Sequence, residues 1–205
     1  YEITGRYGDR PAGKMPSGSP GLRIIVHQTT PIRLTYSDAK KFDEFAREKG
    51  FDDGLVQHQS RGLPLYKSTE RYQRYAKRLI SVGGPEKMGA GQDRHLGLAI
   101  ELVAEANPYQ WPPLQSMPVR VYADGAPLAN AQITVFTRHN PRHVEKAKYQ
   151  TDKDGRSNFL LLAGRDYLVD SVILRPMDGA IGSGDVMWES IWASLTFQVP
   201  ANPKM

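Results

Sequence analysis

The spacing of apolar and polar residues changes along the chain, and each change predicts a different kind of element. Residues 21–36, GLRIIVHQTTPIRLTY, are a run of β-branched and aliphatic positions, typical of a strand that breaks near Pro31 and then resumes. The residues before this run are rich in glycine and proline and indicate one short strand near Tyr1–Thr4. The first part of the chain is therefore predicted to be extended.

The next segment switches to the period of a helix. Asp38 is predicted to cap a first helix and Gly50 to stop it, because aspartate accepts from free backbone N–H groups and glycine adopts the left-handed conformation after a last turn. The apolar residues of this helix share one face: Phe42, Phe45 and Ala46. A second short helix is predicted over Asp52–Ser60, with Leu55 and Val56 pointing inward.

Residues 71–84, RYQRYAKRLISVGG, fit two very different surfaces. Tyrosines interleaved with basic residues are found on protein surfaces that bind nucleic acid. The same residues also form the stripe of an amphipathic helix: Tyr72, Tyr75, Ala76, Leu79 and Ile80. On that helix Arg74 lies on another face, and the glycines follow the helix, whereas a phosphate-binding loop precedes one. We therefore predict a packed helix with Tyr72 and Tyr75 in a core, and no nucleic-acid binding.

Residues 94–205 carry short strand-like stretches at intervals of about ten residues, which predicts an antiparallel β-sandwich of immunoglobulin-like type. Turn signals separate the stretches, including Asp124–Gly125 and DKDG (152–155). The chain has no cysteine, so the sandwich lacks the disulfide of antibody domains. The predicted fold class is mainly β, with the helices ahead of a mobile linker, PEKMGAGQDRH (85–95).

The last predicted strand, WESIWASLTFQV (188–199), has two different faces. The predicted core face carries Glu189, Ile191, Ala193, Leu195, Phe197 and Val199. We expect Trp188 and Trp192, on the other face, to pack on the helical segment, because exposed tryptophan pairs are uncommon on soluble monomers. Asp170, in the strand YLVDSVIL, needs a partner if it is buried, and Lys77 and Arg175 are the candidates for an internal ion pair.

Composition narrows the classes of function. The net charge of +5 favours weak attraction to anionic surfaces without singling out nucleic acid, and no stretch has the length of a membrane span. The lack of cysteine removes thiol catalysis and cysteine-type zinc sites. The sequence has no nucleophile elbow, HExxH motif or phosphate loop, so we expect a non-enzyme. DKDG resembles part of a calcium loop, but a hairpin turn at Asp154–Gly155 accounts for it.

Histidines are the natural ligands to consider for a transition metal. The chain has five: His27, His58, His95, His139 and His143. Their spacing does not form the clusters typical of metal sites, so structural or solvated roles are favoured for each. His27 and His58 are kept as the candidate metal ligands.

Several of these stretches, in this order, resemble a bacterial family catalogued as domain of unknown function 4198. The most specific are RYAK (74–77) and WESIWASLTF (188–197). The resemblance implies a periplasmic or otherwise exported protein associated with nickel and cobalt uptake, with nickel, cobalt or another divalent metal as cofactor. Family members open with a signal peptide and a histidine-led segment, so we expect a segment missing before Tyr1. The implied domains are 1–36, the remainder of an amino-terminal β domain; 37–93, a helical insertion and linker; and 94–205, the sandwich.

Two functions follow as expectations. The first is a non-enzymatic binding protein of the bacterial envelope that serves transition-metal uptake. The alternative is an accessory subunit that binds a protein partner through the sandwich and its tryptophan face. The candidate interface residues are Tyr72, Arg74, Tyr75, Lys77, Asp170, Trp188, Glu189 and Trp192. An enzyme acting on glycans would need paired carboxylates, for which the candidates are Asp170, Asp185 and Glu189.

Overall fold

The computed structural model describes residues 18–83, 90–179 and 184–201, over which the chain forms two sheets and two helices. In chain order the elements are β1 (Gly21–Gln28), β2 (Ile32–Asp38), α1 (Ala39–Glu48), α2 (Gly54–Ser60), β3 (Tyr66–Val82), β4 (Ile100–Ala104), β5 (Ser116–Ala123), β6 (Ala126–Pro127), β7 (Gln132–Asn140), β8 (His143–Gln150), β9 (Arg156–Leu160), β10 (Asp166–Pro176) and β11 (Val186–Gln198). The predicted mainly β fold, an open sandwich, is confirmed. The strand expected near Tyr1–Thr4 lies outside the described residues.

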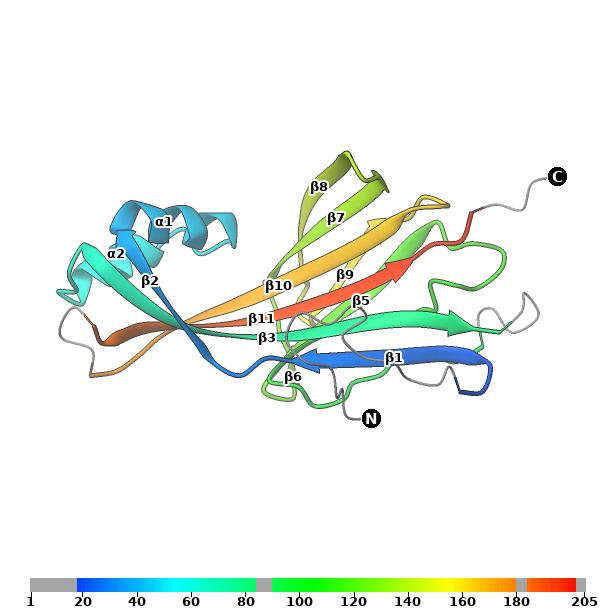
Figure 1. Ribbon diagram of the computed structural model, residues 1–205, viewed down its shortest axis with the longest axis horizontal. Helices are drawn as coiled ribbons and strands as arrows, with labels where there is room; N and C mark the ends of the chain where they lie inside the picture. The colour runs from blue at the N-terminus through cyan, green and yellow to red at the C-terminus, as the bar shows by residue number, and fades with distance from the viewer. Residues whose placement is uncertain (1–17, 84–89, 180–183, 202–205) are drawn as a thin grey trace, which may run out of the picture.

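Three long strands connect the two ends of the molecule. In the part of the chain that the structure describes, the larger sheet has seven strands ordered β1-β3-β11-β10-β7-β8, with β2 also paired to β3. The smaller sheet has four, ordered β4-β5-β6, with β9 also paired to β5. Figure 1 shows β3, β10 and β11 running along the molecule, with the helices at one end and the smaller sheet toward the other. β3 and β11 run parallel, which departs from the antiparallel arrangement expected.

The two faces of the larger sheet are covered at different ends. The alternate residues Ile191, Ala193, Leu195, Phe197 and Val199 lie in the main core, between the two sheets. The intervening residues Trp188 and Trp192 contact aromatic rings of α1 instead. The pattern of the last strand therefore predicted its core face correctly.

Helix α1 begins and ends where the sequence predicts. The Asp38 Oδ1 accepts a hydrogen bond from the Lys41 backbone N–H at 3.0 Å. This bond to the carboxylate holds the pKa of Asp38 below its ordinary value. After the last turn, Gly50 has a φ of 86°, a conformation that favours glycine. The predicted inward residues Phe42 and Ala46 are fully buried.

Helix α2 turns a different face inward from the one predicted. Val56 is 61% exposed, whereas the residues that α2 buries are Gly54 and His58. An ideal Cβ at Gly54 would lie 2.8 Å from the Ala46 Cβ, so the close approach of the two helices favours glycine there. Neither described helix is long and apolar enough to cross a membrane.

Residues 71–82, predicted as a helix, belong to the long strand β3. Their core-facing side chains alternate in the sequence: Tyr75, Lys77 and Leu79. Arg74 and Arg78 between and beside them are exposed. The buried lysine interrupts the apolar alternation of the strand, and the remaining apolar residues fall at helical spacing, so the periodicity was misleading.

The two tyrosines of this stretch lie on opposite faces of the larger sheet. Tyr75 is 8% exposed and belongs to the main core. Tyr72 is half-buried on the helix-bearing face, where the Arg74 guanidinium carbon lies 5.2 Å from its ring centroid. The prediction of a buried ring is therefore correct for Tyr75 and only partly so for Tyr72.

The DKDG turn carries the chain from one sheet to the other. β8 before the turn pairs with β7, and β9 after it pairs with β5, so the predicted hairpin between neighbouring strands is wrong. Asp152 Oδ1 accepts hydrogen bonds from the backbone N–H groups of Asp154 and Arg156, each at 2.9 Å. These bonds also hold the pKa of Asp152 low, and they give the carboxylate a structural use.

Candidate functional site

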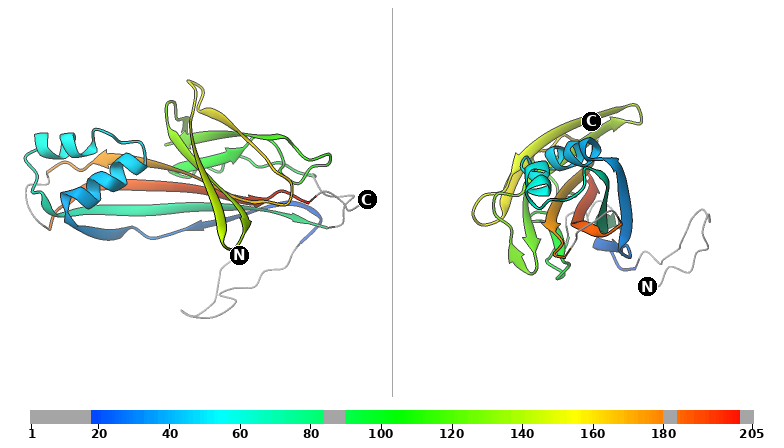
Figure 2. Two further views of the ribbon diagram at one scale, coloured as in Figure 1. Left: turned by 90° about the horizontal axis from the view of Figure 1, so that it is seen from above. Right: turned by 90° about the vertical axis from the view of Figure 1, so that its left-hand side faces the viewer.

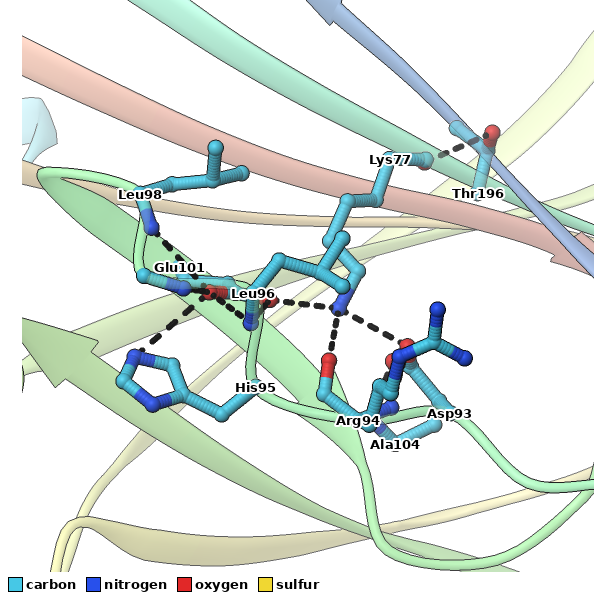
Figure 3. A network of polar contacts seen from close by, with 10 residues as sticks. Lys77, Asp93, Arg94, His95, Leu96, Leu98, Glu101, Ala104 and Thr196 are labelled. Carbon is cyan, nitrogen blue, oxygen red and sulfur yellow. Dashed lines mark hydrogen bonds and ion pairs between the residues drawn. The ribbon is translucent and has the colours of Figure 1, made fainter.

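A cluster of buried charges is centred on Lys77, whose side chain is 1% exposed (Figure 3). The Nζ atom of Lys77 lies 2.8 Å from Asp93 Oδ1 and 2.8 Å from Glu101 Oε1. It also donates to the backbone carbonyl of Arg94 at 3.1 Å. The three protons of the ammonium group thus have three acceptors, which leaves Lys77 a structural cation rather than a free nucleophile.

The two carboxylates of this cluster bind the backbone of the segment that precedes β4. Glu101 accepts from the backbone N–H groups of three successive residues, Leu96, Gly97 and Leu98. Asp93 accepts from the N–H groups of Arg94 and Ala104. The described part of the predicted linker is therefore fixed to the sandwich, and the expectation of a mobile linker is wrong for Asp93 and the residues after it.

His95 lies on the side of the Lys77 cluster that faces solvent. Its ring stacks on Tyr122 with a centroid distance of 4.3 Å, and its Nε2 lies 3.6 Å from Glu101 Oε2. The His95 side chain is 32% exposed, so it is the member of the cluster that meets water. The composition signalled a glycine-rich segment here but not its anchoring, because Lys77, the cation that both carboxylates bind, lies on β3.

A second buried polar group lies beneath the helices. The Trp188 indole Nε1 donates to His58 Nδ1 at 3.0 Å, and His58 Nε2 lies 2.9 Å from the Pro64 carbonyl oxygen. Because Nδ1 accepts, Nε2 carries the proton and donates to Pro64. His58 is fully buried and Trp188 is 2% exposed, so this pair connects α2 to β11.

Trp192 packs on helix α1 at the edge of the same layer. Its ring stacks on Phe45 with a centroid distance of 5.6 Å, and the Lys49 ammonium lies 4.7 Å from the Trp192 centroid. Lys49 also pairs with Asp170 at 2.5 Å. The partner of Asp170 is therefore Lys49, which corrects the expectation of Lys77 or Arg175.

Glu70 is a buried carboxyl group that the sequence analysis did not identify as a candidate site residue. It is 2% exposed on β3, and it accepts hydrogen bonds from the hydroxyls of Tyr36 and Ser190. Burial raises the pKa of Glu70 to about 7, and its hydroxyl partners offset only part of that rise. Burial, with the nearby Glu70 charge, also raises the pKa of Tyr36. The signal in the sequence is a lone carboxylate, Glu70, directly after the β-branched Thr69 within the same strand.

Two of the carboxylates considered for glycan chemistry, Asp170 and Glu189, do not face one cleft. Asp170 lies opposite Ser194 and Glu189 lies opposite Arg175 in the uninterrupted β10–β11 ladder. Positions 189 and 194 differ by an odd number, so the two carboxylates point to opposite faces of the sheet. Glu189 pairs instead with Arg71 at 2.6 Å.

The two candidate metal ligands lie in different environments. His58 uses both ring nitrogens in hydrogen bonds beneath the helices. His27 is exposed on β1, opposite Ala76 of β3. No group of three or more His, Asp or Glu side chains suited to a metal ion occurs among the described residues.

An open groove lies on the helix-bearing face of the larger sheet, beyond the helices. Its volume is about 300 Å³. β3, β7, β8, β10 and β11 all contribute to its lining, which includes Arg78, Phe136, Arg138, Val144 and Leu168. Figure 1 shows the tip of the β7–β8 hairpin standing apart from the long strands, and in Figure 2 it extends past them on the side away from the smaller sheet.

Comparisons with known proteins gave one family. The profile of a family described as Domain of unknown function (DUF4198) matches residues 12–173. No curated protein and no solved structure gives a significant match. The matched region contains both helices and the Lys77 cluster, and it ends before β11 and its two tryptophans.

Proposed function

The chain belongs to this family, Domain of unknown function (DUF4198), and from that membership we propose that it is a non-enzymatic protein of the bacterial envelope that binds another protein as an accessory subunit. The observation that carries the proposal is the uncovered part of the helix-bearing face. Leu168 and Val144, which line the groove there, are 38% and 53% exposed. Apolar side chains gathered in a groove and rimmed by polar groups are typical of interaction sites.

The charged residues that sequence analysis singled out support a binding role over a catalytic one. Asp170 is paired with Lys49, Glu189 with Arg71, and Lys77 with Asp93 and Glu101. Each pair joins separate elements of the fold and so serves to hold the larger sheet, the helices and the smaller sheet together. A partner would not contact Trp188 directly, because helices α1 and α2 cover that indole.

Nickel or cobalt uptake enters the proposal through the family resemblance alone. We assign this chain to the protein-binding part of such a system, because both nitrogens of His58 already have partners in the fold. Equilibrium dialysis against nickel, cobalt, copper and zinc tests this assignment. The expected result is no site tighter than about 100 μM. A tighter stoichiometric site would favour direct metal handling instead.

The accessory role is tested by the size of the natively purified protein. Light scattering after gentle extraction from the envelope fraction should give a mass well above the 22.9 kDa of this chain, with a second polypeptide present in fixed ratio. A strict monomer, or recovery outside the envelope fraction, would contradict the proposal.

A further inference from the structure

The groove beyond the helices has an apolar floor made by one row of the sheet. Phe136 lies opposite Leu168, Leu168 opposite Thr196, and Thr196 opposite Arg78, so these four side chains stand side by side across β7, β10, β11 and β3. Val144 of β8 adds a third apolar side chain, on the β7–β8 hairpin. The floor therefore presents apolar side chains on neighbouring strands, and the guanidinium group of Arg78 lies at one end of this row.

The rim of the groove is basic. Arg78 is exposed, and Arg138 on the opposite side pairs with Asp166 at 2.7 Å. Further along the hairpin, Lys146 and Lys148 both pair with Glu48. The Lys146 ammonium also lies 6.0 Å from the Phe136 ring centroid. Of the charged side chains that line the groove, Arg78 and Arg138 are basic and Asp166 is acidic, so the surplus is positive.

One side of the groove is lined by Val144 of β8, a strand with an open edge. Within the described residues, β8 is the last strand of the larger sheet and pairs only with β7. Seven of its eight residues are exposed. An edge strand presents unpaired backbone N–H and C=O groups, which an extended segment recognises in preference to a helix.

From these three features we propose that the groove binds an extended, acidic segment of the partner protein, with apolar side chains on Leu168 and Phe136 and carboxylates at Arg78 and Arg138. The inference rests on the proposed accessory role and names the chemistry of its partner. A flat anionic membrane fits the geometry less well, because Leu168 lines a groove to which both the β7–β8 hairpin and the long strands contribute. Charge complementarity of this kind sets specificity and association rate.

Binding of synthetic octapeptides tests the proposal. The probe alternates glutamate with leucine and phenylalanine, and its counterpart replaces every glutamate with lysine. By fluorescence anisotropy at low salt, the intact chain should bind the acidic probe with a Kd on the order of 10–100 μM and at least about tenfold more tightly than the basic one. NMR shift changes should centre on Arg78, Phe136 and Leu168.

Three variants locate the site. Arg78→Glu and Leu168→Asp, both at exposed positions, should each weaken binding of the acidic probe by about tenfold or more. Arg33→Glu is the matched control: Arg33 is exposed on β2 and lies opposite Arg71, on the other face of the sheet from Arg78. This control should change the affinity less than twofold. Equal binding of both probes, or insensitivity to Arg78→Glu and Leu168→Asp, overturns the proposal.

Three further outcomes separate this inference from its alternatives. Binding of phosphatidylglycerol vesicles that depends on Arg78, with no binding of the acidic probe, would assign the groove to a membrane surface and overturn the peptide proposal. A native assembly that survives Arg78→Glu and Leu168→Asp would leave the accessory role intact and show that the partner docks elsewhere. A chain that is monomeric in its native state would remove the accessory role itself.

Discussion

Lys77 and Glu101, 24 residues apart in the sequence, meet at 2.8 Å with side chains that are 1% and 0% exposed. Removing the cation would leave two buried carboxylates without their counter-charge. Lys77→Met should therefore lower the free energy of unfolding by about 3–5 kcal/mol, as measured by urea denaturation. The loss should be global, because β3 and β4 both belong to the sandwich.

Two further variants make the Lys77 result specific. Lys40→Met removes an exposed lysine 3.9 Å from Glu44 and should leave stability unchanged within error. Glu101→Gln added to Lys77→Met should recover part of the loss, because one of the uncompensated charges is removed. If Lys77→Met behaves like Lys40→Met, the buried cluster does not hold the fold.

Glu70 should make stability fall as pH rises from about 4.5 to about 7. Burial raises its pKa from 4.5 to about 7, so between these values the folded state keeps a proton that the unfolded state releases. Glu70→Gln, a neutral replacement, should therefore be more stable than the wild type above pH 7, by about 3 kcal/mol at most. The gain should vanish below about pH 4, where Glu70 is protonated in both states.

The measurement for Glu70 is a series of denaturant titrations from pH 4 to pH 8. Glu44→Gln, at a side chain that is 64% exposed, is the control and should show no such pH-dependent gain. A constant difference between Glu70→Gln and the wild type across the series would contradict the raised pKa.

The hydrogen bond from Trp188 to His58 should be visible in the tautomer of the imidazole. A long-range ¹H–¹⁵N NMR spectrum should show neutral His58 with its proton on Nε2, because Nδ1 accepts from the indole. Trp188→Phe keeps an aromatic ring but removes the donor, and it should cost about 1–3 kcal/mol and mix the tautomers. A protonated Nδ1 in the wild type would rule out this bond.

Gly155 should tolerate a side chain worse than Gly125, although both have positive φ, of 73° and 81°. A Cβ at Gly155 would lie 2.8 Å from the Val121 carbonyl oxygen and 3.0 Å from the Leu128 nitrogen, whereas a Cβ at Gly125 meets nothing within 4 Å. Gly125→Ala should cost about 1 kcal/mol from backbone strain alone. Gly155→Ala should cost clearly more in thermal unfolding, and equal losses would show that the backbone contacts are not limiting.

The sequence predicted elements well where one residue type sets a local rule. Asp38 and Gly50 defined α1, and the alternation from Glu189 to Val199 defined the core face of β11. It failed at β3, where Lys77 occupies a core position. A buried lysine has no apolar signature, and only its pairing with Asp93 and Glu101 explains it.

The candidate site was predicted less well than the fold, since its contacts join distant segments. Lys77 and Asp170 were both singled out, but they have separate partners, and the partner of Asp170 is Lys49 on another layer. His58 is a candidate metal ligand by sequence, yet its Nδ1 accepts a hydrogen bond from Trp188, 130 residues later. No local pattern carries such information, because each contact is created by the packing of sheet and helices.

β3 is one continuous strand that joins the helical end of the molecule to the sandwich. At about 3.3 Å per residue, its 17 residues reach roughly 55 Å, and β11 is bonded to it along ten of them. Because the two strands are paired along this length, a force applied at the helical end would load the sandwich directly. A displacement of one end would therefore be transmitted to a partner bound at the other end through these continuous paired strands.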